Sequence, residues 1–130
     1  MTDAAAPPLA AESYVRLTTF RRDGTAVATP VWIVADGAGH LLVVSAPDAG
    51  KVKRLRHTAR VLLTPCDYRG RVAPGAVEVE GSAVLFDDPV RVAQLHRLLA
   101  GKYGLVARAV QLGGRLRRRR GSAGIEITLT

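Results

Sequence analysis

Three stretches decide the fold of this chain: Leu41-Leu-Val-Val-Ser45, Asp48-Ala-Gly-Lys-Val-Lys-Arg-Leu-Arg56 and Arg60-Val-Leu-Leu-Thr-Pro65. The first and third have the length and apolar content of strands, and the small residues that open the second predict a turn into a short helix. A helix N-terminus offers unpaired N–H groups and a partial positive charge, and Lys51 and Lys53 add full charges beside it. The strand, the short basic helix and the following strand together therefore predict a site for a phosphate-bearing ligand against a β-sheet.

The length of 130 residues predicts one domain, which we place at residues 14–130 after a flexible, Ala/Pro-rich N-terminal arm at residues 1–13. We expect the arm to end in a short helical turn. No apolar stretch of the sequence approaches the roughly 20 residues of a membrane helix. The single cysteine, Cys66, excludes an intramolecular disulfide framework and favours a cytoplasmic location.

The charge is strongly positive, with 19 Lys and Arg against 11 Asp and Glu, a net charge of +8. Such an excess on a small domain favours acidic partners: nucleotide-like cofactors, polyanions, nucleic acid or anionic lipid. The positive charge concentrates at residues 51–60 and 115–120. Both clusters are therefore candidates for contact with one long anionic ligand.

Alternation of apolar residues and turn signals predict six strands, at residues 14–20, 25–34, 40–45, 60–66, 76–86 and 125–129. Their short connections favour antiparallel pairing. The predicted fold class is mainly β with a few helices, a six-stranded antiparallel closed or split β-barrel. In the fifth strand Gly81 predicts a bulge or bend, and four residues are expected to face inward: Val77, Val79, Ala83 and Leu85.

Two helical regions complete the predicted elements. The first is the short helix at about residues 49–56. The second starts after Asp87-Asp-Pro89, where a capping residue precedes proline, and it should break near Lys102-Tyr103 before a further helical piece begins at Leu105. Its buried stripe is expected to comprise Val92, Leu95, Leu98 and Leu99.

Five segments occur in a fixed order: Thr18-Thr-Phe-Arg-Arg-Asp-Gly-Thr25, Ala28-Thr-Pro-Val-Trp32, Gly50-Lys-Val-Lys-Arg-Leu-Arg56, Arg60-Val-Leu-Leu-Thr-Pro-Cys-Asp67 and Arg69-Gly70. That order resembles the flavin-binding split-barrel superfamily of pyridoxamine-phosphate oxidases. It is most similar to the actinobacterial branch described as dependent on coenzyme F420, an 8-hydroxy-5-deazaflavin that carries a phosphate and an oligoglutamate tail. The resemblance spans about residues 14–103 and 125–129.

The resemblance implies an FMN-binding split-barrel type of fold and a homodimer with two cofactor sites at the subunit interface. The family's phosphate-binding residues match Lys51 and Lys53, with Arg54 or Arg56 nearby. The resemblance also implies that the ring lies against the second and third strands, and that the end of the fourth strand lines the same groove. The corresponding residues are Thr29, Pro30, Val31, Trp32, Ser45, Ala46, Pro65 and Cys66.

Several of these residues also have simpler interpretations. Pro30 lacks a ladder N–H, so it belongs at a sheet edge or a bulge. Lys51 and Lys53 could form a solvated helix face, and Trp32 could equally pack in the core or in a dimer interface. Cys66 has no His or Lys pattern to activate it and is expected to be a partly buried thiol rather than a nucleophile.

The sequence identifies no catalytic residue and predicts no metal. His40, His57 and His96 lack the spacing of metal ligands, and no Ser-His-Asp or paired-carboxylate arrangement is recognisable. The arginine run could be a solvated helix face, a clamp for the cofactor's glutamate tail or a nucleic-acid patch. Its members are Arg115, Arg117, Arg118, Arg119 and Arg120.

The function that these patterns favour is an oxidoreductase that transfers hydride between reduced F420 and a small unsaturated or quinone-like substrate. FMN is the alternative cofactor, because both molecules require a ring site and a phosphate site. A second hypothesis is a carrier or sensor that holds the deazaflavin without turnover. A nucleic-acid-binding barrel is the third, and the scarcity of basic–aromatic interleaving on any strand counts against it.

Overall fold

The computed structural model describes residues 9–104 and 121–130. They form seven strands and two helices: β1 (Tyr14–Phe20), β2 (Ala26–Val31), β3 (Val34–Ala35), β4 (Leu41–Ser45), α2 (Gly50–Leu55), β5 (Arg60–Cys66), β6 (Val79–Phe86), α3 (Pro89–Tyr103) and β7 (Ala123–Leu129). In this described part, no helix is both long and apolar enough to cross a bilayer.

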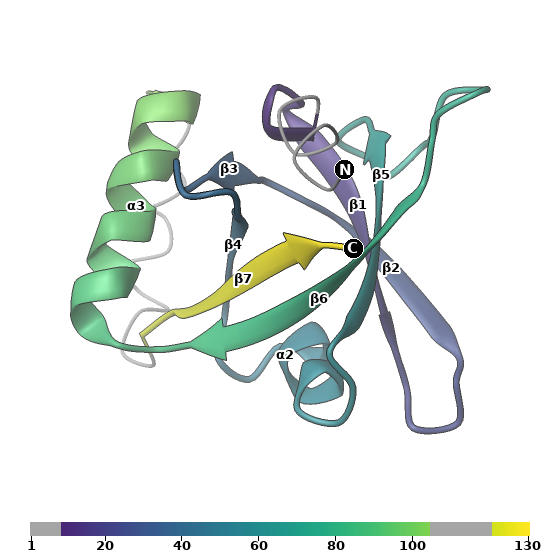
Figure 1. The fold of residues 1–130 in the computed structure, drawn as a ribbon, viewed down its shortest axis with the longest axis horizontal. Helices are drawn as coiled ribbons and strands as arrows, with labels where there is room; N and C mark the ends of the chain where they lie inside the picture. The colour runs from purple at the N-terminus through teal and green to yellow at the C-terminus, as the bar shows by residue number, and fades with distance from the viewer. Residues whose placement is uncertain (1–8, 105–120) are drawn as a thin grey trace.

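All seven strands belong to one antiparallel sheet, in the order β2-β1-β5-β6-β7-β4-β3. The sheet curls strongly, with α3 against one side and α2 near the lower end of the curl (Figure 1). The two edge strands, β2 and β3, are consecutive in the chain and joined only by Trp32 and Ile33. The sheet therefore wraps towards closure without completing it, which confirms the predicted split barrel.

The strand count differs from the predicted six because residues 25–34 do not form one strand. Residues 26–31 pair with β1, whereas Val34 and Ala35 pair with β4 at the opposite edge of the sheet. The chain passes between the two edges at Trp32 and Ile33, so hydrogen bonding cannot continue along a single neighbour. The predicted bounds of β1 and β5 are confirmed.

Strand β6 corrects three expectations. It begins at Val79 rather than residue 76, and Val77 is 70% exposed instead of facing inward. Gly81 causes no bulge, because its pairing with Val61 on β5 and Leu129 on β7 is in continuous register. A Cβ at this position would lie 2.9 Å from the carbonyl oxygen of Thr128, so glycine here permits close approach of β7.

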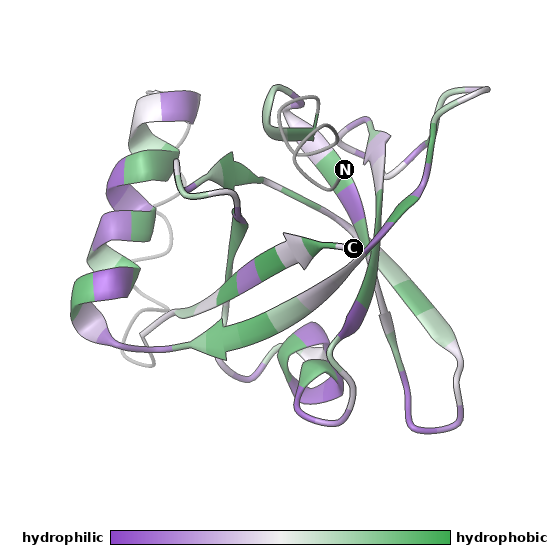
Figure 2. Ribbon diagram, in the orientation of Figure 1, coloured by the Kyte–Doolittle hydropathy of each residue, from purple (hydrophilic) through white to green (hydrophobic). Residues whose placement is uncertain are grey.

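The core has two parts. The larger fills the inside of the curled sheet and includes Val15, Leu17, Leu63 and Ile125. The smaller lies between the sheet and α3 and contains Val34, Leu42, Phe86, Leu95 and Leu99. In Figure 2, α3 alternates between hydrophilic and hydrophobic bands along its length, as expected for a helix with one buried face. Leu98, predicted for that face, is 37% exposed instead.

Helix α3 begins as predicted, because the Asp88 carboxylate accepts a hydrogen bond from the backbone N–H of Arg91 and Pro89 opens the first turn. The predicted break near Lys102-Tyr103 is confirmed, since the helix ends at Tyr103 and Gly104 with a φ of 60° follows as its C-cap. The expected second helical piece and the arginine run lie outside the described residues.

The end of the predicted N-terminal arm is packed against the domain. Leu9 is 4% exposed and belongs to the larger core. Lys102 Nζ donates hydrogen bonds to the carbonyl oxygens of Ala10 at 2.8 Å and Glu12 at 2.6 Å. Leu9 and Ala10 are helical, as expected for the turn that ends the arm, and these contacts tie residues 9–13 to the domain.

Candidate functional site

The centre of the predicted phosphate site is α2, which packs against β1 and β6 through the buried Val52 and Leu55. Arg54 Nε donates a 2.6 Å hydrogen bond to the Thr19 hydroxyl on β1. Its guanidinium lies over Gly50, where a Cβ would come within 2.8 Å of Nη1. The hydrogen bond from Nε to Thr19 thus holds the Arg54 guanidinium over the first turn of the helix.

Lys51 and Arg54 form a concentrated positive charge. Burial lowers the pKa of the Lys51 ammonium, and the neighbouring Arg54 lowers it further. Burial followed by the charge of Arg21 likewise lowers the pKa of Arg54. Across residues 9–104 and 121–130, neither Lys51 nor Arg54 has an ion pair with a carboxylate. A bound anion would relieve this mutual repulsion, so the residues present fit a phosphate group.

The positive surface extends beyond α2 through Arg21, which also lines a pocket of about 390 Å³. The pocket is lined by Phe20, Arg21, Arg22, Gly24, His57, Thr58 and Arg60. Sequence reasoning did not assign Arg21 or Arg22 to the site, although both stand in the Arg-Arg-Asp-Gly turn that the resemblance quoted. The missing information was spatial, because the β1–β2 turn lies near α2 only in the folded sheet.

Lys53 does not join this cluster. It is exposed, whereas Lys51 is partly buried. Two residues apart on a helix differ in direction by about 200°, so the two lysines point to different sides. The structure thus brings Lys51 and Arg54 together and leaves Lys53 apart from them.

The predicted ring-binding residues of β2 divide between the two faces of the sheet. Val31 pairs with Val15 and is buried, and Thr29 pairs with the buried Leu17, so both side chains face the interior. Pro30 is exposed on the outer face, and β2 is an edge strand, as the proline predicted. Only Pro30 of these three β2 residues thus presents its side chain to the outside of the barrel.

Arg16 is a residue of the outer face that the sequence analysis missed. It pairs with Pro30 on one side and with Thr64 on the other. Its Nε is buried without a hydrogen-bond partner among the described residues, while its Nη2 lies 4.0 Å from a carboxylate oxygen of Glu78. An orphaned buried donor is costly and is a ready partner for a polar ligand atom. The sequence signal that could have placed Arg16 on the outer face was the run of polar residues at even-numbered positions of β1.

Trp32 is packed against the smaller core. Its ring stacks on Tyr103 with centroids 4.3 Å apart and planes 9° from parallel. The Tyr103 hydroxyl accepts a hydrogen bond from the Ile33 N–H at 3.0 Å and lies 2.8 Å from the Ser13 carbonyl oxygen as donor. Lys102 Nζ also donates to the Ile33 carbonyl oxygen at 2.6 Å. Lys102 and Tyr103 therefore hold the segment that joins the two sheet edges.

The remaining predicted residues lie at two other places. Ser45 is buried at the end of β4 and donates a 3.0 Å hydrogen bond to the Ala46 carbonyl oxygen, while Ala46 is exposed just before α2. Pro65 and Cys66 end β5 and line a second pocket of about 390 Å³. Burial raises the pKa of the Cys66 thiol, and Asp67 raises it further, which agrees with an unreactive thiol.

The prediction of no metal was based on sequence spacing, and the fold adds information that spacing lacks. His40 follows the β3–β4 turn, where its Nδ1 lies 2.8 Å from Asp36 Oδ2. The pairing of β4 with β7 places Glu126 on its other side, with Oε1 at 3.6 Å from the same nitrogen.

The curled antiparallel sheet is a split barrel of the PNPOx-like type, a fold that binds flavin-type cofactors. The family model described as pyridoxamine 5'-phosphate oxidase matches residues 1–129, and the chain belongs to this family. The family contains oxidoreductases. No protein of curated function matches the sequence.

Solved structures share the fold at low sequence identity. One described as an F420 reductase is 20% identical, with a TM-score of 0.66, over 95% of this chain and 91% of that one. An FAD-binding protein from Mesorhizobium loti is 17% identical, with a TM-score of 0.64 and coverages of 97% and 85%. HutZ, the heme storage protein from Vibrio cholerae, is 10% identical, with a TM-score of 0.70 and coverages of 98% and 88%. The fold is therefore common to proteins with different ligands.

Proposed function

We propose that this protein is a cytoplasmic oxidoreductase that uses coenzyme F420 and acts on a small unsaturated or quinone-like substrate. The observation that carries the proposal is the pair formed by Lys51 and Arg54, two cations held side by side without a carboxylate partner in the described residues. When bound, the reduced deazaflavin supplies the hydride. The protein itself has to bind and orient the cofactor and the substrate, and it has to exclude water from them.

Each part of the ligand has a matching surface in the proposal. Lys51 and Arg54 contact the phosphate, with Lys53 contributing charge from further away. The pocket beside Arg21 and Arg22 offers positive charge to an acidic tail, which favours F420 over FMN, whereas Arg60 in the same pocket is already paired with Glu80 at 3.2 Å.

The ring is assigned to the outer face of the sheet around Pro30. Arg16 Nε there is a free donor for a polar atom of the ring edge. Trp32 and Tyr103 keep the neighbouring chain in place.

The proposed site requires two subunits. Pro30 lies on edge strand β2, whereas Ser45 and Ala46 end β4, close to the opposite edge of the strand order. A homodimer would cover the outer face at Pro30 and bring the second set of residues from the partner subunit. Light scattering of the purified protein should accordingly give twice the chain mass of 13.8 kDa, and a monomer that binds the cofactor at full strength would contradict this part of the proposal.

Titration of the purified protein with F420, FMN and a single-stranded oligonucleotide tests the cofactor assignment. F420 should bind more tightly than FMN, and Lys51→Ala or Arg54→Ala should each weaken F420 binding about tenfold, as expected for a lost charged hydrogen bond. Lys53→Ala should have a smaller effect. Arg97→Ala removes one charge from an exposed position on α3 and is the matched control. Equal or tighter FMN binding, or strong salt-dependent binding of the oligonucleotide alone, would contradict the proposal.

Turnover separates an enzyme from a carrier or sensor. Reduced F420 should be reoxidised faster with the protein than without it when quinone-like substrates are added. Tight binding without any acceleration across such substrates would favour the carrier.

A further inference from the structure

The side chains of Asp36 and His40, from the β3–β4 turn, converge with that of Glu126 on β7. The ligand atoms that they offer all lie within 4.8 Å of one another. His40 Nδ1 is 2.8 Å from Asp36 Oδ2 and 3.6 Å from Glu126 Oε1. All three side chains are partly buried, with 17% exposure for Asp36, 33% for His40 and 23% for Glu126.

These distances suit a tetrahedral zinc centre. Zinc binds imidazole nitrogen and carboxylate oxygen at about 2.0–2.2 Å, so two ligand atoms on the same ion lie about 3.3–3.6 Å apart. The observed 2.8 and 3.6 Å lie close to this range and need only small rotations of the side chains. One imidazole with two carboxylates is also a donor set that Zn²⁺ accepts and that Mg²⁺, which avoids nitrogen, does not favour.

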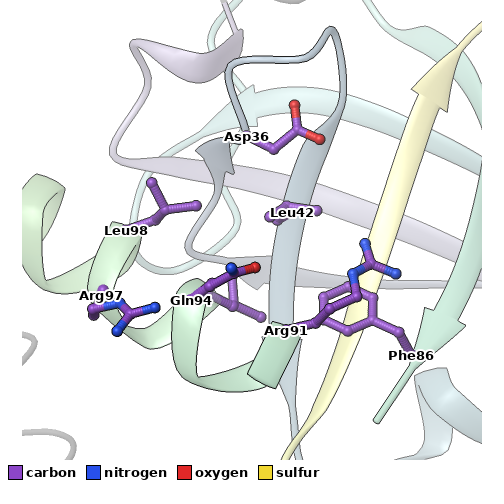
Figure 3. Close-up of a pocket in the computed structure, with 8 residues that line it drawn as sticks. Asp36, Leu42, Phe86, Arg91, Gln94, Arg97 and Leu98 are labelled. Carbon is purple, nitrogen blue, oxygen red and sulfur yellow. The ribbon is translucent and has the colours of Figure 1, made fainter. Parts of the chain in front are cut away.

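The site is positioned before any ion arrives. Asp36 Oδ1 accepts hydrogen bonds from the N–H groups of Ala38 at 2.7 Å and His40 at 3.0 Å, which fixes the carboxylate. Asp36 also lines a pocket of about 550 Å³ between β4 and α3, where its carboxylate stands above Leu42 (Figure 3). A water molecule can reach a fourth coordination position from this pocket.

Arg91 is the group that opposes cation binding. Its Nη2 lies 3.3 Å from Glu126 Oε1, and its guanidinium stacks over Phe86 at 3.9 Å from the ring centroid. The arginine repels an incoming cation and holds Glu126 in an ion pair. Removal of the Arg91 charge should strengthen zinc binding if the three residues form a metal site. If they form only an ion-pair network, the same change should not strengthen zinc binding.

We propose that Asp36, His40 and Glu126 form a zinc-binding site in which three protein ligands leave one position open towards the pocket beside α3. Bound zinc would join the β3–β4 turn to β7 across the edge of the sheet. This inference does not depend on the identity of the redox cofactor.

Calorimetric titration of the untagged protein with ZnCl₂ tests the site. One Zn²⁺ per chain should bind, and MgCl₂ at the same concentration should give no comparable binding. His40→Ala should weaken zinc binding by about a hundredfold or more, because even the loss of a group behind a ligand costs 10–100-fold. His57→Ala removes an imidazole elsewhere and should leave the affinity unchanged.

Arg91→Gln provides the decisive variant. It removes the opposing charge and frees Glu126, so zinc should bind about tenfold more tightly than to the wild type. Anomalous diffraction at the zinc edge should place the ion beside His40 Nδ1. Unchanged or weaker binding in Arg91→Gln, an ion at Cys66 or His57, or equal affinity for Mg²⁺ would overturn the proposal. Thermal unfolding of each variant without zinc verifies that a loss of binding does not reflect a loss of fold.

Discussion

At the scale of single residues, the Tyr103 hydroxyl has the clearest structural task. It accepts from the Ile33 N–H and is within donor distance of the Ser13 carbonyl oxygen. Tyr103→Phe should lower the free energy of unfolding by about 1–3 kcal/mol, because the Ile33 N–H loses its partner. Urea unfolding followed by the fluorescence of Trp32, the single tryptophan, measures this directly.

The stacked ring remains in that variant, so the native fluorescence of Trp32 should be retained. Tyr68→Phe is the matched control. Tyr68 is 62% exposed, so loss of its hydroxyl should change the free energy of unfolding little. Equal stability of Tyr103→Phe and the wild type would show that the hydroxyl contributes nothing to holding this segment.

Lys51 predicts a dependence of stability on pH. Burial and Arg54 lower its pKa in the folded protein below the ordinary value of 10.5. Between the two pKa values the unfolded chain binds more protons, so this residue makes the folded state gain stability as the pH rises towards 10.5. Below the folded pKa the charged ammonium is a constant penalty.

Lys51→Met should therefore raise the urea midpoint at neutral pH, and its advantage over the wild type should shrink as the pH approaches 10.5. The same substitution should weaken phosphate binding, which would make stability and ligand affinity change in opposite directions. Midpoints that stay parallel over the whole alkaline range would contradict the assigned pKa shift.

At the scale of elements, the packing of β6 on β7 depends on a glycine. A Cβ at Gly124 would clash with the Phe86 ring, and the Arg91 guanidinium covers that ring. Gly124→Ala should destabilise the protein by about 3 kcal/mol, since the ring cannot move without disturbing the core beneath α3. Gly101→Ala, in α3 with open space around it, should instead stabilise by up to about 1 kcal/mol. Thermal unfolding of both variants measures the difference, and similar melting temperatures would refute this packing.

The sequence was most informative where pattern and pairing agree. β1 alternates apolar and polar residues, β5 contains an apolar run, and clear turn signals bound both strands. Their predicted bounds are confirmed. Residues 25–34 keep the alternation of one strand, yet the fold divides them because their partners lie at opposite edges of the sheet. Local periodicity carries no information about such a change of partner.

At the scale of the whole molecule, the same limit applies to the candidate site. Lys51 and Arg54 were predictable because they belong to one short basic helix. Arg16 and Arg21 were not, since their significance depends on which strands and turns lie beside Pro30 and α2. The proposed site combines both sets of residues, and within one chain Arg21 already lies close enough to Arg54 for its charge to lower the pKa of Arg54.

The proposed binding of a deazaflavin phosphate by Lys51 and Arg54 can be observed in a crystal structure of the protein with F420. Phosphate oxygens should lie within hydrogen-bond distance of Lys51 Nζ and of the Arg54 guanidinium, with the ring on the outer face near Pro30. A phosphate bound elsewhere, while the Lys51 ammonium faces only water, would contradict it.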